Sequence, residues 1–158
     1  MKKLLLLLVV IAAGSSAIAQ TMPPIDGLKL TTKEDYRAAD TIALQVANYI
    51  LATPSDEKST PRLNGTSFLL KWMGGTADYS FDLDEKVIKY FVKDLDLMGV
   101  YMAALTSSAL QNKTPKDSKS LTTLAAKRFV EYINTPANNV KMNGKLKKLT
   151  EAEQNGEL

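Results

Sequence analysis

Apolar residues recur along most of this chain at alternating spacings of three and four, which places their side chains on one face of an α-helix. The first such face consists of Tyr36, Ala39, Ala43, Val46 and Ile50. Thr32 precedes it, and the carboxylate of Asp35 follows three residues later, which is the capping pattern of a helix start. Pro54 disfavours helical conformation in the residue before it. The pattern therefore predicts a helix from about Thr32 to Ala52.

A second helix is predicted to begin at Thr60-Pro61, an N-cap residue followed by proline at the first helical position. Its apolar side is predicted to carry Leu63, Thr66, Leu70 and Met73, with Leu69 and Trp72 beside them. Gly74-Gly75 is predicted to end the helix, because glycine adopts the left-handed conformation without steric cost.

The most regular apolar stripe predicts a long central helix. The stripe consists of Ile88, Phe91, Leu95, Met98, Met102, Leu105 and Ala109. Asp82, with Glu85 three residues later, is predicted to cap the helix, which continues to about Gln111. Such a helix would be roughly 43 Å long at 1.5 Å per residue. The alternative is two helices that break near Asp94 to Asp96.

Two further helices complete the prediction. One begins at Asp117 or Ser118 and ends at Asn134, and the other is a short terminal helix over 145–153. The inner face of the longer one is predicted to carry Thr122, Ala125, Ala126, Phe129, Tyr132 and Ile133. No run alternates with a period of two over a useful length, so no strand is predicted.

The predicted fold is therefore all-α, with four main helices around one long central helix. The compact helical domain spans 32–153, after an extended N-terminal arm over 20–31 and before a frayed tail over 154–158. Short sequences recur in the same order in the two halves of this domain: Tyr49-Ile50, Thr53-Pro54 and Asn64-Gly65, then Tyr132-Ile133, Thr135-Pro136 and Asn143-Gly144. The recurrence indicates a degenerate helix-loop-helix duplication or a chance repetition of stop and turn signals.

Residues 1–19 have the pattern of a cleavable secretory signal. Lys2 and Lys3 form a short basic region, ten apolar residues follow, and Ala17-Ile18-Ala19 supplies the small residues before the cleavage point. We predict cleavage before Gln20. A membrane-spanning helix needs about 20 apolar residues, so a membrane anchor is the weaker reading. The expected location of the protein is the bacterial periplasm or the medium, without stable membrane insertion after cleavage.

The composition excludes several classes of function. The chain contains no His and no Cys, so Ser-His-Asp triads, Cys-His dyads, disulfides and ordinary zinc sites are excluded. Beyond residue 19 there are 18 basic and 17 acidic residues, which is no electrostatic footprint for nucleic acid. No cofactor is expected. A local basic cluster of Lys141, Lys145, Lys147 and Lys148 is either a solvated face or a contact for an anionic surface.

The segment from Gly74 to Asp82 is the predicted ligand-binding site. Its residues are Trp72, Asp78, Tyr79, Phe81 and Asp82, which combine stacking surfaces with carboxylate acceptors. The alternative is structural: Asp82 caps a helix, Phe81 packs onto that helix and Trp72 fills the core. A calcium site is not predicted, because the acidic residues of this segment lack the EF-hand spacing.

These features favour an exported, non-catalytic binding or protein-interaction domain of the bacterial envelope. Its expected partner is an envelope protein, a peptide or a glycan. The alternative is a carboxylate-dependent hydrolase that acts on cell-envelope glycans, because two carboxylates suffice for that chemistry without His. A third possibility is a structural envelope factor with no small ligand. The absence of His and Cys favours the non-catalytic readings.

Overall fold

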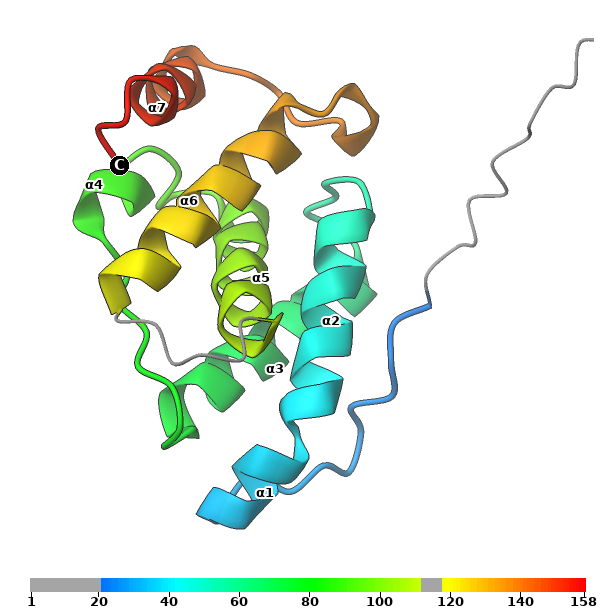
Figure 1. The fold of residues 1–158 in the computed structure, drawn as a ribbon. Coiled ribbons are helices and arrows are strands. Elements are labelled where there is room, and N and C mark those ends of the chain that lie inside the picture. Colours follow the sequence, from blue (N-terminus) through cyan, green and yellow to red (C-terminus); the bar gives the residue numbers. More distant parts are fainter. Residues whose placement is uncertain (1–20, 112–117) are drawn as a thin grey trace, which may run out of the picture.

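The computed structural model describes residues 21–111 and 118–158, which contain seven α-helices, one 3₁₀ helix and no strand (Figure 1). The predicted all-α fold class is confirmed. The predicted signal peptide lies outside the described residues, and so does Asp117, one of the two predicted starts of the helix that ends at Asn134. Within the described residues, no helix has the length and apolar character needed to span a membrane. The elements are α1 (Lys33–Ala38), α2 (Asp40–Ala52), α3 (Thr60–Gly75), α4 (Glu85–Ile88), α5 (Leu95–Gln111), α6 (Ser118–Asn134), the 3₁₀ helix η1 (Pro136–Asn138) and α7 (Gly144–Gln154).

Helix α5 lies in the interior and packs against α2, α3 and α6 (Figure 1). It is buried on nearly every side, with Val100, Tyr101 and Leu105 fully enclosed. Gly99 allows α3 to approach, because a Cβ atom at this position would lie 2.3 Å from Oγ1 of Thr66. Apolar burial around α5 is thus the main source of stability for this fold.

The predicted single helix from Leu83 to Gln111 is wrong, and the alternative break is present. Between α4 and α5 the chain makes a turn, in which the Asp94 backbone N–H donates to the Phe91 carbonyl. The Asp94 side chain then accepts a hydrogen bond of 2.9 Å from the Leu97 N–H, as helix N-caps do. Phe91 nevertheless stays in the core and stacks on Phe129, with ring centroids 4.3 Å apart. The spacing of apolar residues therefore continues unchanged across the turn, so the spacing alone does not indicate where α4 and α5 separate.

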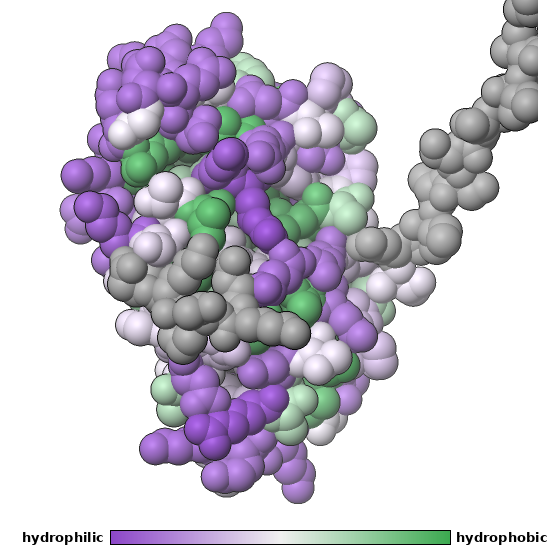
Figure 2. All heavy atoms as spheres, in the orientation of Figure 1, coloured by the Kyte–Doolittle hydropathy of each residue, from purple (hydrophilic) through white to green (hydrophobic). Residues whose placement is uncertain are grey.

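The first predicted helix is confirmed with a bend. Thr32 and Asp35 form the expected reciprocal capping box, in which hydrogen bonds to Thr31 and Thr32 lower the pKa of Asp35 to about 2. At Ala39 the helix divides into α1 and α2. The last predicted helices are also confirmed, with the expected inner face of α6 buried. Hydrophilic residues cover the outer face of α7, at the top of Figure 2, and hydrophobic residues are visible beneath it.

The predicted buried face of α3 is wrong. Leu63 and Leu70 are 41% and 55% exposed. The buried residues of this helix are Arg62, Gly65, Phe68, Leu69 and Trp72. The face is rotated because Arg62 lies inward against a carboxylate of α5, an arrangement that an apolar pattern cannot indicate.

The glycines that end α3 have a different role from the predicted one. Gly74 and Gly75 lie within the helix, and neither has a positive φ. A Cβ atom on Gly75 would lie 2.0 Å from Cζ of Tyr36, so this residue must be glycine for the Tyr36 ring to pack on α3. The left-handed cap occurs instead after α7, where Gly156 has a φ of 71°. The Glu157 N–H then bonds back to the Ala152 carbonyl, so the predicted frayed tail begins with a regular capping turn.

Candidate functional site

The three aromatic residues of the predicted site form one cluster. Trp72 is fully buried, and its Nε1–H donates to the carbonyl of Tyr36 and to Oδ1 of Asp40, both at 3.2 Å. The rings of Tyr79 and Phe81 lie 5.8 and 5.7 Å from the Trp72 ring and 6.3 Å from each other. Tyr79 and Phe81 are half-buried. Trp72 therefore lies in the core and packs against the loop. Of the three rings, only those of Tyr79 and Phe81 are exposed enough to contact a ligand.

Asp78 makes a two-point ion pair with Arg37 of α1. Arg37 donates through Nε and Nη2 to the two carboxylate oxygens, with 2.7 Å between Nη2 and Oδ1. The hydrogen bonds from Arg37 lower the pKa of Asp78. This exposed pair fixes the loop to α1, forty-one residues earlier in the chain.

Asp82 does not cap a helix, so that part of the sequence interpretation is wrong. Asp84 is the N-cap of α4, and its Oδ1 accepts from the Lys86 N–H at 2.8 Å. Asp82 is exposed, and its backbone carbonyl lies 3.3 Å from Oγ1 of Thr122, whose shorter hydrogen bond of 2.9 Å goes to the Ser118 carbonyl within α6. Its carboxylate therefore lies on the surface, at the end of the loop that faces α6.

A buried polar network that the sequence analysis missed lies between α2, α3 and α5. The side chains of Arg62 and Asp96 are 2% and 4% exposed, and Arg62 Nε lies 2.7 Å from Asp96 Oδ1. Arg62 also donates to the carbonyls of Ile50 and Thr53, and Ser55 donates to Asp96. Burial has the largest single effect on the pKa of Arg62 and would by itself lower it, but the hydrogen bond and charge of Asp96 and the interaction with Tyr132 together raise the pKa above its ordinary value. Each partner is satisfied, so this network is structural.

Tyr132 of α6 joins the edge of this network. Its hydroxyl donates to the Thr53 carbonyl at 2.8 Å, and burial raises the pKa of Tyr132 to about 12. The sequence signal for this network was weak: one charged residue, Arg62 or Asp96, stands among the apolar positions of each of the two helices. A single sequence does not reveal that the two positions face each other.

A cavity of about 590 Å³ lies between the α4–α5 turn and the start of α7. Its lining includes four lysines: Lys89 and Lys93 from the turn, and Lys145 and Lys148 from α7. Two of these belong to the basic cluster noted in the sequence. The sequence analysis missed the other two as site residues, because the predicted continuous helix would have placed them along its outer surface.

The described residues contain no cluster of three or more acidic side chains that could hold a metal ion. The chain matches no protein-family model, and comparison with curated proteins and with solved structures gives no match. The function therefore has to be argued from the residues themselves.

Proposed function

We propose that this chain is an exported, non-catalytic binding protein of the bacterial envelope. Its binding surface is the loop over 74–82, and its partner is an envelope protein, a peptide or a glycan. The observation that carries this proposal is that the part of this segment beyond α3, over 76–82, has no regular secondary structure and is held to α1 and α3 by side-chain contacts. Loops held by a scaffold are common binding sites, because little conformational entropy is lost when a partner binds.

Two separate contacts fix this loop. The Arg37–Asp78 ion pair holds one part, and the Tyr79 and Phe81 rings pack on Trp72. Ala77, Ser80 and the Asp82 carboxylate remain on the outside. The loop thus presents hydroxyl and carboxylate groups beside two aromatic edges, a combination suited to hydrogen-bonding partners with a flat apolar face.

The positions of the carboxylates support binding over hydrolysis. A glycoside hydrolase needs an acid and a base that face one cleft about 5–9.5 Å apart. Asp96 is enclosed with Arg62, whereas Asp84 and Asp94 accept hydrogen bonds from backbone N–H groups at helix starts. Asp78 is paired with Arg37. Each of these carboxylates has a structural partner, which favours the non-catalytic proposal.

The test uses the double variant Asp78→Asn with Tyr79→Ala. Its matched control is Asp56→Asn with Tyr49→Ala, which changes an exposed carboxylate and a half-buried ring outside the loop. Cosedimentation with peptidoglycan sacculi and capture of periplasmic proteins should show binding that the loop variant weakens about tenfold or more, equivalent to about 1.4 kcal/mol. Intact mass of the periplasmic protein should correspond to a chain that begins at Gln20.

Two results would count against this proposal. Equal binding by the loop variant and the control would remove the loop as the site. Release of soluble fragments from sacculi, abolished by one Asp or Glu substitution, would replace binding by the hydrolase alternative.

A further inference from the structure

Four lysines and one carboxylate, that of Asp94, line the cavity, so its lining carries a net positive charge. Lys145 and Lys148 are three residues apart on α7 and therefore share one face of that helix. Among the described residues the two ion pairs are Arg37–Asp78 and Arg62–Asp96, so none of the four has a carboxylate oxygen within 4.0 Å. Like charges held close together are unfavourable, and an anion between them would relieve the repulsion.

One acidic group, Asp94, lines the same cavity. Its Oδ1 accepts the hydrogen bond from the Leu97 N–H, and its charge offsets one of the four lysine charges. The start of α7 is also capped, because the Asn143 side chain accepts from the N–H groups of Lys145 and Leu146. The positive character of the cavity therefore comes from the lysine side chains and does not depend on free N–H groups at the helix end.

The floor of the cavity is apolar. Phe91, Leu97 and Leu146 line it from the core side, each less than 5% exposed, whereas Val92 at the rim is 52% exposed. The ammonium group of Lys89 lies 4.9 Å from the centroid of the Tyr90 ring, which holds this lysine beside the apolar surface. The volume of about 590 Å³ lies within the range of small-molecule sites.

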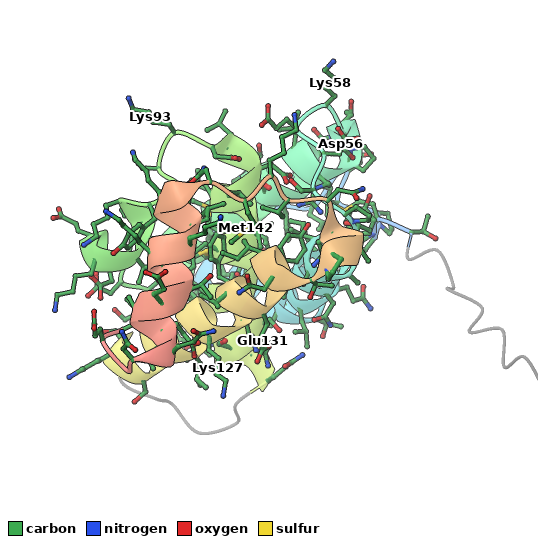
Figure 3. The ribbon with its side chains drawn as sticks, turned by 90° about the horizontal axis from the view of Figure 1, so that it is seen from above. Asp56, Lys58, Lys93, Lys127, Glu131 and Met142 are labelled. Carbon is green, nitrogen blue, oxygen red and sulfur yellow. The ribbon has the colours of Figure 1, made fainter. Side chains whose placement is uncertain are left out.

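A second cavity of about 300 Å³ adjoins the first and shares Asp94, Leu97, Asn143 and Leu146 with it. Its other lining residues include Asp56, Glu57, Lys58 and Lys141, so acidic and basic side chains are balanced at this end of the combined groove, and the excess of lysines lies in the first cavity. Figure 3 shows Lys93 at the tip of the α4–α5 turn, above the start of α7 and with its side chain extending outward, and Asp56 and Lys58 on the other side of the molecule.

We propose that the lysine-lined cavity binds a small ligand that carries a phosphate-like anionic group beside a short apolar chain. The lysines bind the anion, and the apolar floor contacts the chain. The site is separate from the loop over 74–82, which lies at the lower end of the molecule in Figure 1, whereas α7 lies at the upper end. The proposal therefore stands or falls independently of the proposed binding loop.

Isothermal titration of the purified protein with n-hexyl phosphate, inorganic phosphate and n-hexanol tests the two halves of this site. Hexyl phosphate should bind about tenfold or more tightly than either of the other probes, because it alone uses both the cations and the apolar floor. Its affinity should fall as the salt concentration rises. Absence of hexyl phosphate binding, or equal affinity for inorganic phosphate, would overturn the proposal.

A pair of charge-matched variants separates the cavity from general surface charge. The cavity variant replaces Lys89, Lys93, Lys145 and Lys148 by Gln, and the control replaces Lys29, Lys71, Lys127 and Lys147, which are exposed and do not line the cavity. The cavity variant should lose hexyl phosphate affinity about tenfold, and the control should stay within about twofold. Circular dichroism confirms that both fold. Equal losses in the two variants would refute a site at the cavity.

Vesicles distinguish the natural source of the anion. Vesicles of phosphatidylglycerol bound by the native protein and not by the cavity variant would identify a lipid headgroup, with phosphatidylcholine vesicles as the uncharged reference. Hexyl phosphate binding without vesicle binding would identify a soluble phosphate ester. Both outcomes support the cavity as the anion site.

Discussion

Two Arg–Asp pairs in this molecule have the same two-point geometry and opposite environments, which makes them a controlled comparison. The Arg62–Asp96 side chains are 2% and 4% exposed, whereas those of Arg37–Asp78 are 60% and 33% exposed. We therefore compare Asp96→Asn with Asp78→Asn. Each substitution removes one negative charge and keeps the size of the side chain.

The structure allows the two effects to be ranked. Asp96→Asn leaves the Arg62 charge enclosed with two backbone carbonyls and the Thr53 hydroxyl as its remaining acceptors. Loss of one partner of a buried pair costs about 3–5 kcal/mol, and the retained acceptors place this case near the lower limit. For a domain of this size, 3 kcal/mol lowers the melting temperature by roughly 10 °C. Asp78→Asn should lower it by less than about 2 °C, because solvent screens the exposed pair.

Thermal and urea unfolding followed by far-UV circular dichroism measure both variants. The double variant Arg62→Met with Asp96→Leu should lose less stability than the sum of the two single changes, because neither charge is then left unpaired. Equal melting temperatures for Asp96→Asn and Asp78→Asn would refute the reasoning. Burial of the ion pair would then not determine its contribution to stability.

Two further predictions concern packing and pH. Gly99→Ala should lower the free energy of unfolding by about 1–3 kcal/mol, because the added methyl group clashes with Thr66. Urea unfolding should show that a second substitution, Thr66→Ala, restores most of this loss. A Gly99→Ala variant more stable than the native protein would contradict the prediction. Because the folded pKa of Asp78 lies below its ordinary value of 3.8, the Arg37 ion pair contributes to stability above about pH 4 and is lost as the pH falls through the lowered pKa. Trp72 emission should then shift to the red, and Asp78→Asn should show that shift already at pH 7; unchanged emission would contradict it.

The parts of the fold that the sequence predicted correctly depend on local signals. The Thr32–Asp35 capping box and the inner face of α6 each involve residues within a few positions of one another. Local hydrogen bonds and a helical period determine such features with little help from the rest of the molecule. The all-α class follows from the same signals.

The incorrect parts depend on contacts between distant residues. The buried face of α3 is set by Arg62, whose partner Asp96 lies thirty-four residues away. Gly75 adjoins the ring of Tyr36, which belongs to another helix. A single sequence contains no information on which charged residue meets which, so both features were assigned to local causes.

The candidate loop was predicted as a group of residues but not as an arrangement. Tyr79 and Phe81 were grouped with Trp72 only because they are close in sequence, and in the structure the three rings form a cluster. The partner of Asp78 is Arg37, which no local pattern indicated. The possible duplication of Thr53-Pro54 and Thr135-Pro136 stays a prediction.

The break before α5 connects the largest error of the sequence analysis with the strongest new site. A continuous helix through Asp94 would extend the axis of α5 past the α4–α5 turn and leave Lys89 and Lys93 on its flank. In the structure, the Asp94 cap begins α5 there, and the chain before it turns so that Phe91 still packs on Phe129. The same turn brings the two lysines to the start of α7. The lysine-lined cavity therefore depends on the turn that precedes the Asp94 helix cap. The regular spacing of apolar residues did not indicate this turn.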